Sequence, residues 1–352
     1  MSSSKIKLPI TDKYVHVQLL NGGSMTAECH KIHAGEPADR FRLYNWAFYV
    51  YHPTSQRHII WDLGLTSDPE DYAPAISNRV LKEAQFEGPW ESISEQIKRR
   101  NGVTADEIDR IIFRWEQTQV PSTDIALIPI GSHAHFDHCR PVRQTFPNAK
   151  VLFGPGTSEH CSPGHLTDPC SIWDGRFFDP EQATERWETL NGPWVPFGPF
   201  DRAMDLFGDA SFWIIEAPGH MPGNLCACAK IAMGEWVVLG SDCCHSRYNN
   251  PSSVITVFTE TQSNIDRALL NGTKEFGTFK LPDGSMFCLH SDVSAAKDTL
   301  ARMREMESLG AHIALAHDTT WMEKENDPVL LSLLDAEFLR DMRVALRQQA
   351  PF

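Results

Sequence analysis

One short stretch constrains this chain more than any other: Ser132-His133-Ala134-His135-Phe136-Asp137-His138, which follows the apolar run 125–130. It places three imidazoles and a carboxylate within six residues. If the apolar run is a strand, side chains alternate between faces at its end, so His133 and His135 point the same way. Imidazole and carboxylate are the ligands that first-row divalent metals, zinc above all, prefer. The stretch therefore predicts a metal site rather than a solvated loop that happens to contain histidines.

The same pattern, an apolar run that ends in a ligand-type residue, recurs three more times along the chain. Two Pro-Gly pairs bend the backbone on either side of His220, which follows the apolar run 212–215. Two further apolar runs lead to Asp242 and to His317. Each instance alone is also compatible with an ordinary core or surface residue. Together they predict one site whose ligands come from distant parts of the chain.

These residues resemble the motifs of the metallo-β-lactamase superfamily. The motifs are His133-x-His135-x-Asp137-His138, Pro218-Gly219-His220, Gly240-Ser241-Asp242 and Ala316-His317-Asp318. Their order and intervals are most similar to the acyl-homoserine-lactone lactonase branch and its fungal lactone and lactam hydrolase relatives. The resemblance covers most of the chain and includes residues 59–64, which end in Asp62-x-Gly64, and residues 92–108.

The resemblance implies an α/β fold, a four-layer αββα sandwich in which two mixed β-sheets are flanked by helices. It implies a single hydrolase domain over residues 1–352. An insertion at about 154–208, rich in Gly, Pro and aromatic residues, is typical of a loop region that shapes or covers a pocket. Most of its aromatics are expected to pack, and two or three to face the substrate. His160 and Trp173 are candidate substrate contacts.

The resemblance also implies two metal ions. His133, His135 and His220 would hold the first, Asp137, His138 and His317 the second, and Asp242 would bridge both. The ligand types favour two Zn²⁺, although iron, manganese and cobalt also fit them. A hydroxide that bridges the metals would be the nucleophile, with Asp137 and Asp242 in the catalytic set.

The chain departs from the lactonase pattern in two places. Lactonases commonly carry a tyrosine three residues after the bridging aspartate, where this chain has His245, with Tyr248 three residues further on. A histidine can protonate a poor leaving group such as a lactam nitrogen, so we expect a catalytic role for His245 and a substrate contact from Tyr248. The second departure is the segment 114–131, so that either 108–113 or 125–130 could be the strand that presents His133. The nearer run is favoured.

The leading hypothesis is therefore a hydrolase that opens a cyclic ester or cyclic amide, that is, a lactone, lactam or cyclic carbamate. An apolar or aromatic small molecule is expected, which suggests detoxification. The alternative within the superfamily is an acyl thioesterase. A third hypothesis, a metal-binding protein without turnover, is disfavoured because no ligand is missing.

Composition agrees with a globular enzyme, at 41% hydrophobic and 22% charged residues. The net charge of −14 argues against nucleic-acid partners. No apolar stretch reaches transmembrane length, and the N-terminus lacks the apolar core of a signal peptide. The nine cysteines form no disulfide framework, so a cytoplasmic location with reduced thiols is expected. The sequence leaves the oligomeric state open, a homodimer included.

Overall fold

Two structural units make up the described part of the chain. The structure is a computed structural model that describes residues 6–105, 127–130, 132–149, 151–244, 275–281, 284–319 and 327–348. Unit 1 comprises residues 1–14, 24–44 and 192–352, and unit 2 comprises residues 15–23 and 45–191. The single domain expected from the sequence stays a prediction.

Unit 2 is built on a six-stranded mixed sheet in the order β1-β2-β3-β4-β5-β6. Strands β2 and β3 are antiparallel, whereas β3, β4, β5 and β6 run parallel to one another. The long strands β1 and β2 start or end in unit 1. The strands are β1 His16–Glu28, β2 Arg40–His52, β3 Arg57–Trp61, β4 Leu127–Ile130, β5 Val151–Phe153 and β6 Trp187–Thr189.

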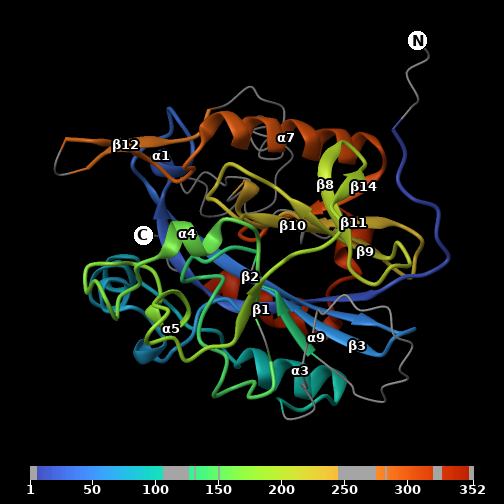
Figure 1. The fold of residues 1–352 in the computed structure, drawn as a ribbon, viewed down its shortest axis with the longest axis horizontal. Coiled ribbons are helices and arrows are strands. Elements are labelled where there is room, and N and C mark those ends of the chain that lie inside the picture. The colour runs from blue at the N-terminus through green and yellow to red at the C-terminus, as the bar shows by residue number, and fades with distance from the viewer. Residues whose placement is uncertain are drawn as a thin grey trace. The chain divides into compact units, whose positions relative to one another are not determined.

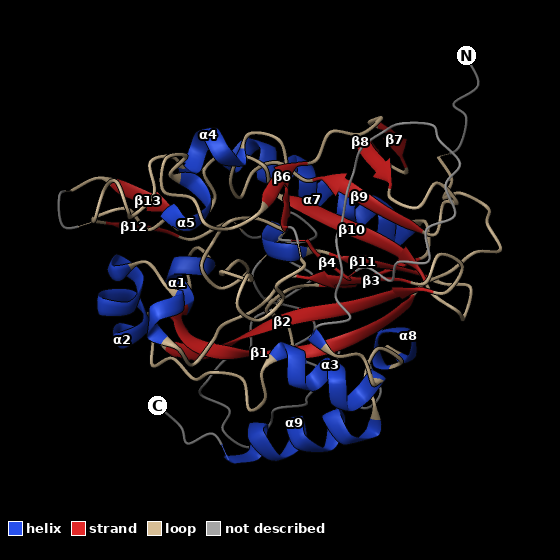
Figure 2. Cartoon of the chain, turned by 60° about the horizontal axis from the view of Figure 1, so that its bottom comes forward, coloured by secondary structure: helices blue, strands red, loops and turns tan. Residues whose placement is uncertain are grey.

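Short helices accompany this sheet. They are η1 Pro69–Asp71, η2 Ile76–Val80, α2 Leu81–Glu83, α3 Ile93–Asn101, α4 Thr157–Cys161 and α5 Gly175–Phe178. Helix α3 begins with a capping box between Ser92 and Glu95 and ends at Gly102 in the left-handed conformation. The buried Gln96 amide exchanges two hydrogen bonds with the backbone of Asn21, which fixes α3 beside β1 (Figure 2).

Unit 1 contains the second six-stranded sheet, in the order β14-β11-β10-β9-β8-β7. Its neighbouring strands are antiparallel except for the parallel pair β11 and β14. The strands are β7 Val195–Phe197, β8 Phe200–Asp205, β9 Phe212–Glu216, β10 Leu225–Lys230, β11 Trp236–Leu239 and β14 Ala311–Ala314. A separate antiparallel pair is formed by β12 Thr278–Lys280 and β13 Met286–Cys288. The helices are α1 Cys29–Ile32, η4 Ser241–Cys243, α7 Val293–Ser308, α8 Pro328–Leu331 and α9 Ala336–Gln348.

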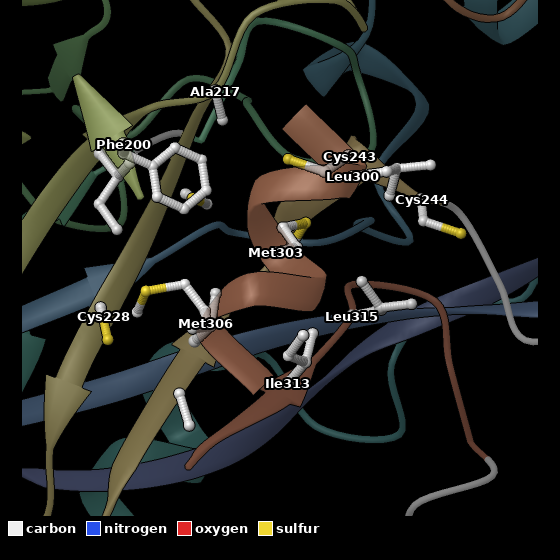
Figure 3. Packing of buried hydrophobic residues seen from close by; sticks show 14 of the residues in the cluster. Phe200, Ala217, Cys228, Cys243, Cys244, Leu300, Met303, Met306, Ile313 and Leu315 are labelled. Atoms are coloured by element: carbon white, nitrogen blue, oxygen red, sulfur yellow. The ribbon is translucent and has the colours of Figure 1, made fainter. Parts of the chain in front are cut away.

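Helix α7 lies along the sheet of unit 1 (Figure 1). The Asp292 side chain caps it by accepting a hydrogen bond from the Ala295 backbone N–H. Its apolar face, which has the 3.6-residue period of an amphipathic helix, is buried through Ala296, Leu300, Met303 and Met306. These side chains pack among small and sulfur-containing residues of the sheet, such as Cys228 (Figure 3).

The two cysteines of β10 are core residues. Cys226 and Cys228 of β10 are both fully buried in the core cluster beneath α7. All nine cysteines carry free thiols. Cys226 and Cys228 therefore serve as small apolar residues of the sheet.

The segment 154–208 is more regular than a loop insertion. It contributes α4, α5 and β6 in unit 2, and β7 and β8 in unit 1 extend the second sheet. Its aromatic residues pack inward in large part, since Phe177, Phe178, Phe197 and Phe200 are buried. Strands this short, three residues in β6 and β7, lack the periodicity by which sequence patterns are recognised.

None of the helices within the described ranges combines the length and the apolar character that crossing a membrane requires.

We expect Met303→Ala to destabilise the protein by about 2–5 kcal/mol, because it leaves a cavity between α7 and the sheet. Met303 is fully buried, whereas Met233 is 57% exposed. Met233→Ala is the matched control and should change stability by no more than about 0.5 kcal/mol. Chemical denaturation followed by tryptophan fluorescence measures both, and equal midpoints for the two variants would contradict the packing described.

Candidate metal centre

The metal-type residues of unit 2, that is, its predicted histidine and aspartate ligands, follow the ends of parallel strands that lie side by side. Strand β4 lies between β3 and β5, and Trp61 of β3 pairs with Ile130 of β4. This confirms that the run nearer to His133 is a strand, whereas the other candidate, 108–113, lies outside the described residues. Because parallel strands end at one edge of a sheet, Asp62 and Ser132 emerge together from β3 and β4. The loop that starts at Ser132 thus meets the turn that starts at Asp62.

The carboxylate of Asp62 organises this loop. Its Oδ1 accepts a hydrogen bond from the Ser132 backbone N–H at 2.7 Å. Its Oδ2 accepts from Ser132 Oγ at 3.0 Å and from His138 Nδ1 at 3.0 Å. Asp62 is 1% exposed and adopts the left-handed φ of 63°, which is unfavourable for a residue with a Cβ. A buried carboxylate with three donors around it stabilises a backbone conformation that would otherwise be costly.

The turn after Asp62 requires glycine at position 64. Gly64 has a φ of 62°, and a Cβ on it would lie 2.3 Å from the Gly22 Cα. The Asp62-x-Gly64 pattern is therefore a backbone requirement as well as a source of the carboxylate.

These contacts determine which nitrogen of each imidazole keeps the lone pair that a metal ion would need. His138 donates its Nδ1 proton to Asp62, so its Nε2 keeps a lone pair, and this Nε2 lies 3.6 Å from Asp137 Oδ2. Ser132 Oγ gives its single proton to Asp62 and must accept the one on His133 Nδ1, 3.0 Å away. His133 Nε2 therefore also keeps a lone pair, and it lies 3.0 Å from Nδ1 of His135.

The carboxylate of Asp137 is oriented from a neighbouring strand. Asn45 of β2, itself buried, donates from Nδ2 to Asp137 Oδ2 at 2.9 Å. The adjacent Phe136 packs edge-on against Tyr72, next to the small cluster of Leu65, Tyr72, Ala73, Ile76 and Leu81. Phe136 thus anchors the loop on its apolar side while its neighbours present polar atoms.

The metal-type residues of unit 1 follow the same principle of aligned strand ends. In the parallel pair, Leu239 of β11 is opposite Ala314 of β14. Asp242 and His317 each stand three residues beyond that pair. The register therefore brings both side chains to the same edge, where His317 Nε2 lies 3.0 Å from Asp242 Oδ1.

His220 reaches the same carboxylate from the loop after β9. Its Nε2 lies 3.5 Å from Asp242 Oδ2, and both side chains are buried. His317 Nδ1 donates to the backbone carbonyl of Tyr44 at 2.6 Å, so its Nε2 keeps a lone pair on the side of Asp242. His290 packs edge-on against the His220 ring, with the ring centroids 5.2 Å apart.

The residues just before α7, together with Thr299 within the helix, hold the His220 loop in place. Ser291 N–H donates to the His220 carbonyl and Asp292 N–H to the Gly219 carbonyl, both at 2.9 Å. Thr299 Oγ1 donates to the Pro218 carbonyl at 2.7 Å. Gly219 has a φ of 130°, and a Cβ there would lie 2.2 Å from the Ala296 nitrogen. Glycine at this position is what allows the loop to lie against the helix.

The structure brings seven of the predicted site residues together in two groups, one in each unit. Unit 2 brings together His133, His135, Asp137 and His138, and unit 1 brings together His220, Asp242 and His317. Trp173 stacks on His135 at 5.3 Å with an interplanar angle of 9°, and His160 contacts Trp173 edge-on at 5.4 Å. His245 and Tyr248 lie outside the described residues.

Sequence reasoning missed the residues that orient the ligands: Asp62, Ser132 and Asn45. Asp62 carried one available signal, since it stands directly after a buried apolar strand and is followed two residues later by Gly64. Ser132 and Asn45 carried none, because their partners depend on which strands lie side by side.

The donor set in each unit fits divalent metal ions. Within a unit, buried imidazole nitrogens with lone pairs face a buried carboxylate, and the opposite imidazole nitrogen is held by an oxygen acceptor. That outer hydrogen bond is the usual partner of a metal-bound histidine. Neutral imidazoles with carboxylates match zinc and its first-row neighbours, although they do not choose among them.

No protein-family model matches the chain, whereas several curated proteins resemble it. A metallo-hydrolase of Annulohypoxylon moriforme is 28% identical over 293 residues, which are 79% of this chain and 71% of the relative. A cytochrome P450 monooxygenase of Penicillium roqueforti is 28% identical over 270 residues, 75% of this chain but only 28% of that longer protein. A γ-lactamase of Fusarium pseudograminearum is 28% identical over 218 residues, 57% of this chain and 45% of the relative.

Solved structures share the fold. A quorum-quenching N-acyl homoserine lactone lactonase aligns with a TM-score of 0.55 and 15% identity, covering 90% of this chain and 96% of that one. An N-acyl homoserine lactone hydrolase with a product bound at its catalytic metal centre aligns with a TM-score of 0.53 and 14% identity, covering 88% and 94%.

The chain therefore has the α/β fold of the metallo-β-lactamase superfamily, and the predicted fold class is confirmed. Its resemblance to lactonases and to fungal lactam hydrolases is confirmed as well. The relatives and the metal-type residues together indicate a metal-dependent hydrolase.

We expect Asp62→Asn to lower metal affinity by about 10–100-fold, because the amide nitrogen cannot accept from Ser132 or His138. Asparagine tolerates a positive φ, so the change removes hydrogen bonds without adding backbone strain. Asp68→Asn, at an exposed position in the same unit, is the control. Metal content after dialysis measures the effect, and equal retention in both variants would refute the orienting role of Asp62.

Proposed function

We propose that this protein is a dinuclear metal-dependent hydrolase that opens a cyclic ester or cyclic amide of a small molecule. The observation that carries the proposal is the orientation of the two ring nitrogens of buried histidines in both units. Nδ1 of His138 and of His317 is held by an oxygen, while Nε2 faces a buried aspartate. A histidine that serves only as a core residue needs no such arrangement.

In this proposal the two groups act together, as the resemblance to the superfamily implies. His133, His135 and His220 would hold one ion, Asp137, His138 and His317 would hold the other, and Asp242 would be shared. With only two carboxylates among the ligands, two divalent ions would keep a net positive charge at the site. Bound there, the ions supply the Lewis acidity that activates water near neutral pH and polarises the substrate carbonyl.

The chain's own residues orient the imidazoles and shield the site from bulk water. Asp62 and the Tyr44 carbonyl keep the imidazoles in the tautomer whose Nε2 carries a lone pair. The carboxylates and most of the imidazoles are buried, so the charges of the site act in a medium of low dielectric constant. For a cyclic amide the departing nitrogen needs a proton, and His245 is our candidate donor on the basis of its position in the sequence.

The substrate class follows from the relatives and from one surface of unit 2. The relatives include γ-lactamases, and proteins of the same fold include lactonases, so both ring types are candidates. Half-buried Trp173 offers an aromatic surface beside His135, and exposed Leu166 and Ile172 lie on the same loop. Burial lowers the pKa of His160, which favours the neutral ring beside an apolar ligand. We therefore propose an apolar or aromatic substrate.

Removal of metal should abolish hydrolysis, and two equivalents of Zn²⁺ per chain should restore it. The substrates to compare are an aryl-fused five-membered lactam or cyclic carbamate and an acyl-homoserine lactone. Steady-state rates before and after chelation, with metal content measured on the same samples, decide the question. Hydrolysis that survives complete chelation would refute the proposal, and hydrolysis of neither ring would refute the substrate class.

His245→Ala should lower kcat for the aryl-fused lactam by about 10²–10⁴-fold, because the departing nitrogen loses its proton donor. The lactone, whose leaving oxygen needs a proton less, should be affected far less. His245→Tyr should retain lactone hydrolysis and remain defective on the lactam. Equal losses on both substrates, or none on the lactam, would show that His245 is not the donor.

Trp173→Ala should raise KM for the aryl-fused substrate by about threefold to tenfold, the loss expected for one aromatic contact. KM for a short-chain homoserine lactone should change little. Trp90→Ala, at a 42% exposed tryptophan of the same unit, is the control. If both Trp173 and Trp90 variants bind the aryl substrate like the parent, the aromatic contact is wrong.

A further inference from the structure

Arg140 is a buried arginine whose hydrogen-bonding groups are not satisfied by the described residues. It stands two positions after His138 and is 6% exposed. Its nearest charge partner is Asp71, with 3.8 Å between Arg140 Nη1 and Asp71 Oδ2, too long for a hydrogen bond. Its Nε is enclosed without a partner, and no described residue accepts a hydrogen bond from its guanidinium.

Arg176, a second arginine near Asp71, shows what a satisfied guanidinium looks like in this part of unit 2. It forms a bidentate pair with the Asp174 carboxylate. It also donates to the backbone carbonyls of Glu70 and Asp71 at 2.9 Å and 2.7 Å. Arg140 has none of these partners, although it is the more buried of the two.

An unsatisfied guanidinium at this depth is costly. Arginine carries five N–H donors, and buried charged groups are nearly always paired and hydrogen-bonded. Burial lowers the pKa of Arg140 from its ordinary value, although the neighbouring Asp71 raises it. A group that destabilises the free protein in this way is typical of a site whose partner is a ligand.

The position of Arg140 places that ligand beside the metal motif. Asp137, His138 and Arg140 belong to one short loop, in which the N–H groups of His138 and Cys139 both donate to the His135 carbonyl. Phe136 of the same loop packs against Tyr72, the neighbour of Asp71 in the chain. The guanidinium therefore faces Asp71 at the end of η1, on the loop that carries the metal-type residues.

We propose that Arg140 binds a carboxylate that the substrate carries apart from the bond that is cleaved. The planar guanidinium matches a carboxylate with two parallel hydrogen bonds, which would satisfy the donors that the protein leaves unpaired. With the proposed function, on which this second step rests, the substrate is an organic acid that contains a lactone or lactam ring. Asp71 then competes weakly with the ligand, because its carboxylate already faces Arg140 from 3.8 Å.

The test measures binding of benzoate to the full-length, zinc-reconstituted protein by calorimetry, so that it does not depend on turnover. Arg140→Met should weaken benzoate binding tenfold or more, and Asp71→Asn should strengthen it because a competing carboxylate is removed. Arg143→Met is the matched control, since Arg143 is exposed on the same segment and donates to the Thr184 carbonyl. Binding in the Arg143 variant should equal that of the parent.

Several outcomes would overturn the assignment. Benzoate binding that persists in Arg140→Met belongs to the metal ions, and absence of binding to the parent excludes the site. Inorganic phosphate that binds Arg140 as tightly as benzoate would indicate a general anion site. A purely structural ion pair predicts that Arg140→Met lowers the melting temperature, whereas a ligand site predicts that it does not.

A kinetic experiment distinguishes this inference from the proposed function. For a matched pair of aryl-fused lactones with and without a ring carboxylate, Arg140→Met should raise KM tenfold or more for the acid alone. If the protein hydrolyses neither ring type but binds benzoate through Arg140, the proposed function is wrong and the carboxylate site stands. If both lactones are hydrolysed with equal loss in the variant, the carboxylate site is wrong and the hydrolase stands.

Discussion

The arrangement of the metal-type residues in unit 2 depends on one buried carboxylate, that of Asp62. Asp62 accepts three hydrogen bonds from Ser132 and His138, and through Ser132 it also sets the proton of His133. Without these bonds, both imidazoles could rotate or exchange tautomers, and their lone pairs would not face one direction. The left-handed backbone of Asp62 shows that the fold accepts local strain in order to place this acceptor.

In unit 1, backbone carbonyl groups rather than a carboxylate hold His317 and the loop of His220 in place. The Tyr44 carbonyl holds His317, and Ser291, Asp292 and Thr299, just before and within α7, hold the loop of His220 through three hydrogen bonds to carbonyl oxygens. The packing of α7 on the sheet through Leu300 and Met303 therefore contributes to the position of a candidate ligand. Stability of the core and geometry of the site are coupled there, because Gly219 leaves no room between loop and helix.

Much of the fold and of the candidate site could be predicted from the sequence, because the informative residues follow apolar runs. A run that ends in histidine or aspartate indicates a strand end, and β4, β9, β11 and β14 confirmed this for each ligand group. The three-residue strands β6 and β7 were not foreseen in the segment 154–208, because they are too short to show a recognisable period. Arg140 also gave no signal, since the lack of a hydrogen-bond partner is a property of the folded surroundings.

The sequence by itself determined the kinds of candidate ligand and their order, since these depend on local composition and spacing, and the fold class followed from the family resemblance of these motifs. The tertiary structure alone decided which atoms of those side chains are available. Asp62 stands 70 residues before Ser132 in the chain, and Tyr44 stands 273 residues before His317. Hydrogen bonds over such separations arise only when strands have paired in register, because the partner of a polar group is set by which chain segments become neighbours in space.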